Sequence, residues 1–295
     1  MKKFATLLFV LIACASTDAQ VIESIGAEQW AVNIESPKEF VKKPALGKNR
    51  MRIATYSILP EPVPRENKLE RWDSRIKQIT HILKDCHVDA VGTQRAMRWQ
   101  MKQLAEASGY SFVGNATDSI RPSAATKAIL YNPEKFKLVA WGDSIYPPES
   151  KRDSIGLEYT WAHFKEKQSK KDFYMFNVMM RTKAQAEKLL LDIAGIAGKK
   201  PVVVTSDIGL PIYKAAPGVM RNSAYKDAFI IAQHKTGKEG TVHDFRSLNP
   251  TRRYDYIHLS PSFTVDEYDT TDEELTTIRP GSDHLPILVD LTFGK

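Results

Sequence analysis

The chain has 295 residues, of which 42% are hydrophobic and 26% are charged, and its formal net charge is +7. This is ordinary globular composition, which allows a sizeable core in one large domain or two small ones and excludes a low-complexity chain. The basic residues form scattered pairs, such as Lys170-Lys171 and Lys199-Lys200. This distribution argues against a nucleic-acid partner without excluding one.

The first residues are typical of a secretory signal. Two lysines precede an apolar run over residues 4–13, which is too short to span a bilayer, and small and polar residues follow. Cleavage would remove a signal peptide of residues 1–19, whereas a sequence resembling a bacterial lipobox ends at Cys14 and offers lipidation instead. A third interpretation makes Cys14 a simple apolar residue of the signal. We therefore predict an exported protein that is periplasmic, secreted or a cell-envelope lipoprotein, with membrane contact only through a lipid anchor at Cys14.

Residues 20–50 show no sustained period and are predicted to form a leader segment before a single domain of residues 51–295. Apolar residues three and four positions apart predict helices over about 69–83, 96–107 and 183–197. Short apolar runs predict strands at 51–58, 88–93, 127–131, 136–140, 159–164, 173–178, 201–205, 254–259 and 286–291. This mixture of hairpins and crossover helices indicates an α+β fold with two packed sheets and helices outside them.

Five of the predicted strand ends carry polar residues in a distinctive series. In chain order they are Thr55-Tyr56-Ser57, Gln94-Arg95, Asn177-Val178-Met179, Ser206-Asp207-Ile208-Gly209 and Ser282-Asp283-His284. The series resembles the motifs Thr-Tyr-Asn, Gln-Glu, Asn-Thr-His, Gly-Asp-Phe-Asn and Ser-Asp-His of the endonuclease/exonuclease/phosphatase family. The resemblance covers nearly all of the chain from residue 51 onward. It implies a four-layer α/β/β/α sandwich of two packed mixed sheets, with strand ends that converge on one cleft.

The family hydrolyses phosphate esters with a magnesium ion, which takes oxygen ligands. By this resemblance Asp207, Asp283 and His284 match catalytic positions, and Asn177 and Asp255 match supporting ones. Two alternatives remain open for His284, which is either catalytic or a structural histidine hydrogen-bonded to Asp255. Asn177 is expected to be structural.

Four positions depart from the family motifs. Ser57 and Arg95 replace the asparagine and glutamate that hold magnesium, Met179 replaces a histidine, and Gly209 replaces an asparagine that contacts phosphate. A guanidinium is a permanent cation that only donates hydrogen bonds, so it cannot ligate magnesium. We therefore expect neither a metal nor another cofactor at this site.

Two roles are open for Arg95. It either pairs with Asp207 or Asp283, filling the metal site with a buried ion pair, or presents its planar fork to a phosphate, sulfate or carboxylate of a ligand.

Three functions remain open. The leading hypothesis is an exported pseudoenzyme that binds a small anionic or phosphorylated ligand through Arg95. The second is an active hydrolase of a phosphate ester, sugar phosphate or nucleic acid that uses Asp207, Asp283 and His284 with magnesium. The third is a surface scaffold for a protein, glycan or lipid partner, which the sequence neither supports nor excludes.

Overall fold

The computed structural model describes residues 42–61, 65–114, 127–148, 156–211, 214–245, 249–271 and 280–294. The predicted signal peptide, Cys14 and most of the predicted leader lie outside these ranges. No helix within them is long and apolar enough to cross a membrane.

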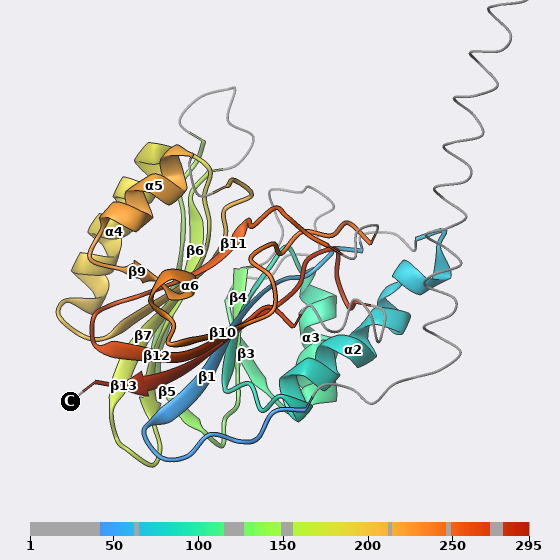
Figure 1. Ribbon diagram of the computed structural model, residues 1–295, viewed down its shortest axis with the longest axis horizontal. Helices are drawn as coiled ribbons and strands as arrows, with labels where there is room; N and C mark the ends of the chain where they lie inside the picture. Colours follow the sequence, from blue (N-terminus) through green and yellow to red (C-terminus); the bar gives the residue numbers. More distant parts are fainter. Residues whose placement is uncertain are drawn as a thin grey trace, which may run out of the picture.

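Two mixed sheets pack face to face in the middle of the molecule (Figure 1). The first has the strand order β10-β12-β13-β1-β2-β4-β3, and the second has the order β5-β6-β7-β8-β11-β9. The strands of the first sheet are β1 (Arg50–Ser57), β2 (Ala90–Gln94), β3 (Ser111–Val113), β4 (Lys127–Tyr131), β10 (His234–Thr236), β12 (Phe263–Asp269) and β13 (Ile287–Phe293). Those of the second are β5 (Phe136–Ile145), β6 (Glu158–Glu166), β7 (Asp172–Met179), β8 (Val202–Asp207), β9 (Lys226–Asp227) and β11 (Asp255–Leu259).

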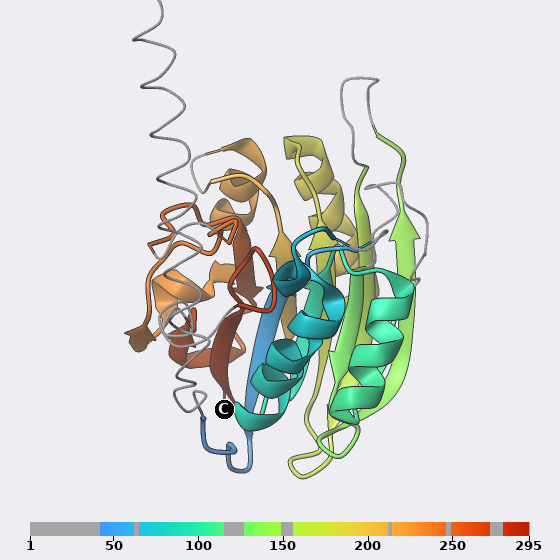
Figure 2. The same ribbon diagram turned by 90° about the vertical axis from the view of Figure 1, so that its right-hand side faces the viewer.

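Helices cover the outer faces of both sheets. They are α2 (Trp72–Asp85), α3 (Arg98–Ser108), α4 (Lys183–Ala197) and α5 (Ala215–Asn222), with a 3-10 turn η1 (Lys68–Glu70) before α2. The short α6 (Ala228–Ile231) instead contacts β11 and β12, one strand of each sheet. α4 and α5 lie outside the second sheet, and α2 and α3 lie side by side outside the first (Figures 1 and 2). The α+β prediction and the four-layer α/β/β/α sandwich of two packed mixed sheets are thus confirmed.

Apolar side chains fill the space between the layers. Between the sheets, the ring centroid of Phe164 lies 5.4 Å from that of Phe136 and 5.7 Å from that of Phe173. On the outer face of the second sheet, Leu189 and Ile193 of α4 are fully buried. Because such interiors are close-packed, the strand ends are held in fixed positions.

The two sheets approach each other closely at Gly92 of β2. A Cβ atom there would lie 2.0 Å from Thr205 Oγ1 and 2.6 Å from Asn177 Oδ1, so only glycine fits. Asn177 Nδ2 donates hydrogen bonds of 2.8 Å to the carbonyl oxygens of Thr93 and Ala128 in the opposite sheet. Asn177 therefore joins the two sheets.

Some elements differ from the prediction. β5 continues to Ile145 instead of ending at residue 140, because a bulge between Leu138 and Ala140 shifts its register against β6 and interrupts the alternation of side chains. α5 was not predicted because it contains Pro217 and Gly218. Pro217 lies in its first turn, where a missing N–H costs no intrahelical hydrogen bond.

The described end of the predicted leader packs against the domain. The backbone N–H of Lys43 donates to the carbonyl oxygen of Asp85 at 3.1 Å, and the carbonyl oxygen of Pro44 accepts from Arg52 Nη1 at 3.1 Å. Contact with the domain thus begins several residues before residue 51, where the prediction placed its start.

Candidate functional site

The polar residues of the predicted series meet at one end of the sandwich. β1 and β2 run parallel and end at Ser57 and Gln94, which are paired in register. In the second sheet β7 and β8 also run parallel, and Met179 pairs with Asp207 at their ends. Asp255 begins β11 directly opposite Asp207. Since parallel strands end at the same edge of a sheet, the fold itself brings these side chains together.

Asp283 and His284 come from the segment just before β13. Ser282 fastens this segment to the end of β1, because its hydroxyl donates to the carbonyl oxygen of Ser57 at 2.6 Å and accepts from the N–H of Leu59 at 2.9 Å. The two residues are thereby carried to the edge where the strand ends converge.

Arg95 follows β2 directly and makes a two-pronged ion pair with Asp283. Its Nη1 donates to Asp283 Oδ2 at 3.1 Å, and its Nη2 donates to Asp283 Oδ1 at 2.5 Å. The Nε atom donates to Ser57 Oγ at 2.6 Å. The Arg95 and Asp283 side chains are only 20% and 16% exposed. Of the two roles left open for Arg95, the structure therefore shows the ion pair, and its use as a ligand-binding residue stays a prediction.

Asp207 is held by the same group of side chains. Its Oδ2 accepts a hydrogen bond from Ser57 Oγ at 2.7 Å and lies 3.6 Å from Arg95 Nε. Ser57 therefore links the buried carboxylate to the guanidinium, and it is itself fully buried. Arg95 thus forms ion pairs with both Asp207 and Asp283, the two aspartates that match catalytic positions of the family.

The electrostatics of this cluster favour the charged forms of all three groups. Burial alone would raise the pKa of both aspartates and lower the pKa of Arg95, but mutual attraction outweighs it. Arg95 and His284 hold the pKa of Asp283 below its usual range, and His284 and both Arg95 and Arg181 do the same for Asp207. The pKa of Arg95 is raised, chiefly by Asp283. The cluster is therefore ionised at neutral pH.

His284 forms a hydrogen-bonded pair with Asp255. The distance between His284 Nδ1 and Asp255 Oδ2 is 2.7 Å, and the hydroxyl of Thr241 donates to the same carboxylate oxygen at 2.6 Å. Burial lowers the pKa of His284, but the carboxylate of Asp255 more than compensates and the net shift is upward. The arrangement satisfies a structural histidine and equally orients a proton-carrying one, so both alternatives remain.

Arg181, which the motifs did not identify, also belongs to the site. It lies just beyond the end of β7, and its Nη1 donates to the carbonyl oxygens of Asp207 at 3.1 Å and Met180 at 3.3 Å. The same atom is 3.8 Å from Asp207 Oδ1. The available sequence signal was a basic residue two positions after the end of a strand.

The donor atoms present do not fit a magnesium ion. Asp207, Asp255 and His284 offer ligand atoms within 4.8 Å of one another, and Oδ1 of each aspartate is buried without a hydrogen-bond partner in the described part of the chain. However, His284 Nδ1 is already bonded to Asp255. Magnesium requires near-octahedral oxygen ligands, and the guanidinium of Arg95 beside Asp207 would repel a divalent cation.

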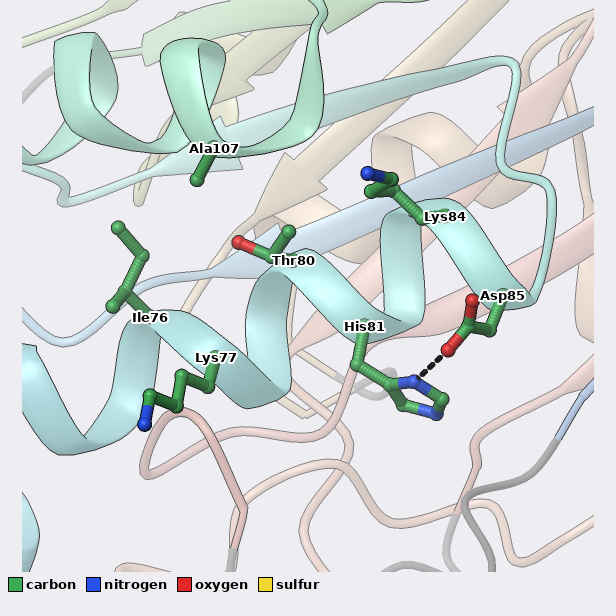
Figure 3. A pocket seen from close by; sticks show the side chains of 7 residues that line it. All are labelled: Ile76, Lys77, Thr80, His81, Lys84, Asp85 and Ala107. Atoms are coloured by element: carbon green, nitrogen blue, oxygen red, sulfur yellow. Dashed lines mark ion pairs between the residues drawn. The ribbon is translucent and has the colours of Figure 1, made fainter.

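A cavity of about 460 Å³ opens beside Asp283 and gives the site access to solvent. The described residues that line it are Leu59, Arg65, Glu70, Asp244, Phe245 and Asp283. A second hollow of about 370 Å³ lies between α2 and α3, where Ala107 faces Ile76 and Thr80 and where His81 pairs with Asp85 (Figure 3). It shares no residue with the strand-end cluster, so of these two cavities the first belongs to the candidate site.

No protein-family model matches the sequence, and no curated protein matches it. Solved structures do match. An endonuclease/exonuclease/phosphatase from Bacteroides vulgatus is 24% identical with a TM-score of 0.71, over 83% of this chain and 99% of that one. A mannosyl-6-phosphatase from Bacteroides thetaiotaomicron is 23% identical with a TM-score of 0.72, over 82% and 100%. The human Nocturnin catalytic domain with bound sulfate is 17% identical with a TM-score of 0.67, over 88% and 99%. Together with the two-sheet architecture and the converging strand ends, these likenesses show that the chain has the fold of the endonuclease/exonuclease/phosphatase family.

Proposed function

We propose that the chain is an exported protein of this fold that has lost magnesium-dependent phosphoester hydrolysis and uses its cleft to bind a small anionic or phosphorylated ligand. The observation that carries the proposal is the ion pair of Arg95 with Asp283, reinforced by Ser57. The apolar run near the N-terminus supports export.

In this proposal Arg95 stands where the family has its metal-holding glutamate. The guanidinium neutralises Asp283 and Asp207, as an ion would do. Unlike an ion, it offers no open coordination position for a water molecule or a phosphate oxygen, because arginine has only hydrogen-bond donors. The site keeps its charge balance but loses the Lewis acid that activates the phosphoryl group.

The substitution at Met179 supports the same conclusion. Its side chain is 4% exposed and lies opposite Asp207 in the sheet. A thioether neither carries a proton nor donates a hydrogen bond, so it cannot stabilise the charge that develops on a transferring phosphoryl group.

Two of the similar structures support a small oxyanion as the ligand. One is described as a mannosyl-6-phosphatase, and the other, Nocturnin, carries a bound sulfate. A cleft with this fold that no longer cleaves a phosphate ester can still accommodate the charged group of such a compound.

The second candidate function is an active phosphoesterase. It is favoured by the buried group of Asp207, Asp255 and His284, because Oδ1 of each aspartate has no hydrogen-bond partner among the described residues and can accept one from a water molecule. In that case magnesium would be the cofactor, and a phosphate ester, sugar phosphate or nucleic acid would be the substrate.

An assay of hydrolysis separates the two candidates. The exported protein is incubated with 4-nitrophenyl phosphate, bis(4-nitrophenyl) phosphate and a DNA oligonucleotide, in magnesium and then in manganese. We expect rates equal to those of an Asp207→Ala variant of the same preparation. A wild-type rate at least tenfold above that control would overturn the proposal and establish the active alternative.

A further inference from the structure

The guanidinium of Arg181 lies in the space that a side chain at position 209 would fill. An ideal Cβ built on Gly209 would be 2.6 Å from Arg181 Cζ and 2.7 Å from its Nη2. Gly209 also has a φ of +61°, a conformation that side chains disfavour. The guanidinium of Arg181 can therefore take this position only because residue 209 has no side chain.

Within the described residues, one of the three nitrogen atoms of this guanidinium donates hydrogen bonds. Nη1 donates to the carbonyl oxygens of Asp207 and Met180, which fixes the plane of the group. Nε and Nη2 donate to no residue in the described part of the chain, and the side chain is 29% exposed. These two atoms form one edge of the guanidinium, and two parallel N–H donors are the geometry that binds an oxyanion most strongly.

The surroundings leave Arg181 available for an anion. Ser57 and Arg95 both lie at Oδ2 of Asp207. Oδ1 of Asp207 is 3.8 Å from Arg181 Nη1, which is an ion-pair distance but too long for a hydrogen bond, so Asp207 does not occupy the Nε and Nη2 donors. Lys127 is a second cation nearby, buried and paired with Glu158. Burial, with repulsion from Arg181 as a smaller contribution, lowers the pKa of Lys127. An anion bound at Arg181 would offset that repulsion.

We propose that the open Nε and Nη2 edge of Arg181 binds the phosphate or sulfate group of the ligand. The inference rests on the proposed function, and it assigns the ligand-binding role to Arg181 instead of Arg95, whose own donors are occupied by Asp283 and Ser57. The ligand is then a phosphate or sulfate monoester whose tetrahedral group accepts two hydrogen bonds from one arginine.

Titration calorimetry with inorganic phosphate and, separately, inorganic sulfate tests the assignment. We expect saturable binding of at least one anion to the wild type and at least a tenfold loss of affinity in Arg181→Met. Gly209→Ala should cause a similar loss without changing any charge, because the new Cβ displaces the guanidinium. Arg181→Lys should also bind weakly, since an ammonium lacks the two-pronged edge. Arg181→Lys serves as the second test variant if Gly209→Ala does not fold.

Lys183→Met is the matched control. The Lys183 side chain is 67% exposed and lies two residues after Arg181 in the sequence. Its replacement removes one positive charge near Arg181, and we expect the affinity of this variant to stay within twofold of the wild type. Equal losses in Arg181→Met and Lys183→Met would show diffuse charge attraction and overturn the assignment. Wild-type affinity in Arg181→Met would overturn it as well, while leaving the proposed binding function intact. No binding of either anion by the wild type would contradict both.

Discussion

At the scale of single residues, Arg95 determines the character of the site. Its φ of +67° lies in the left-handed region, which costs a non-glycine residue about 1–2 kcal/mol. In this conformation the guanidinium contacts Asp283 and Ser57. A backbone cost at a buried ion pair indicates that the position is fixed by its surroundings.

We expect Arg95→Met to destabilise the protein by roughly 3 kcal/mol, because it leaves the carboxylate of Asp283 largely buried without its cation. The double variant Arg95→Met/Asp283→Asn should recover part of this loss, since the amide carries no charge. Urea unfolding of the wild type, Arg95→Met, Asp283→Asn and the double variant measures both effects. Additive losses would mean that the two side chains do not depend on each other.

Most of the site residues could be predicted from the sequence because they stand in motifs at strand ends. Ser57, Arg95, Asp207 and Asp283 are all brought together as expected. The sequence could not decide which acid Arg95 pairs with, because both aspartates lie within reach of one long side chain.

Arg181 escaped prediction for a different reason. Its place depends on free space over Gly209, and that space is a property of the folded backbone. A glycine in a motif indicates conformational freedom, but it does not identify the side chain that occupies the vacated volume.

At the scale of elements, apolar periodicity and end signals placed most helices and strands. α4 begins after Thr182, whose hydroxyl accepts from the N–H of Gln185, and the predicted and observed ranges agree. β12 was not predicted, because a bulge between Val265 and Glu267 interrupts its alternation and its second half is acidic. Local patterns therefore fail where an irregular backbone changes the face on which a side chain lies.

The close approach of β2 to β8 makes Gly92 a sensitive position. We expect Gly92→Ala to destabilise the protein by about 1–3 kcal/mol, as for other overpacked interiors, because the new Cβ would overlap with Thr205 Oγ1. Gly195→Ala in α4 is the matched control, since nothing lies within 4 Å of its Cβ position. It should stabilise the protein by about 0.5–1 kcal/mol through helix propensity. Similar unfolding midpoints for the two variants in guanidinium chloride would refute the packing explanation.

At the scale of the whole molecule, the order of the motifs gave more information than hydrophobic periodicity did. Periodicity predicted two sheets with outer helices, while the topology followed from the resemblance in the motif series. The strand order could not be derived from local patterns, because neighbours such as β1 and β13 are far apart in the sequence. Solved structures with this fold are 17–24% identical to the chain, so the same fold is reached from widely different sequences.

We propose that Arg95 takes the place of a metal ion. Titration calorimetry with magnesium chloride tests it most directly, on the wild type, on Asp283→Asn and on the double variant Ser57→Asn/Arg95→Glu, which supplies the oxygen ligands that the wild type lacks. We predict no saturable binding to the wild type or to Asp283→Asn, and measurable binding to the double variant. Tight magnesium binding by the wild type that disappears in Asp283→Asn would contradict the claim.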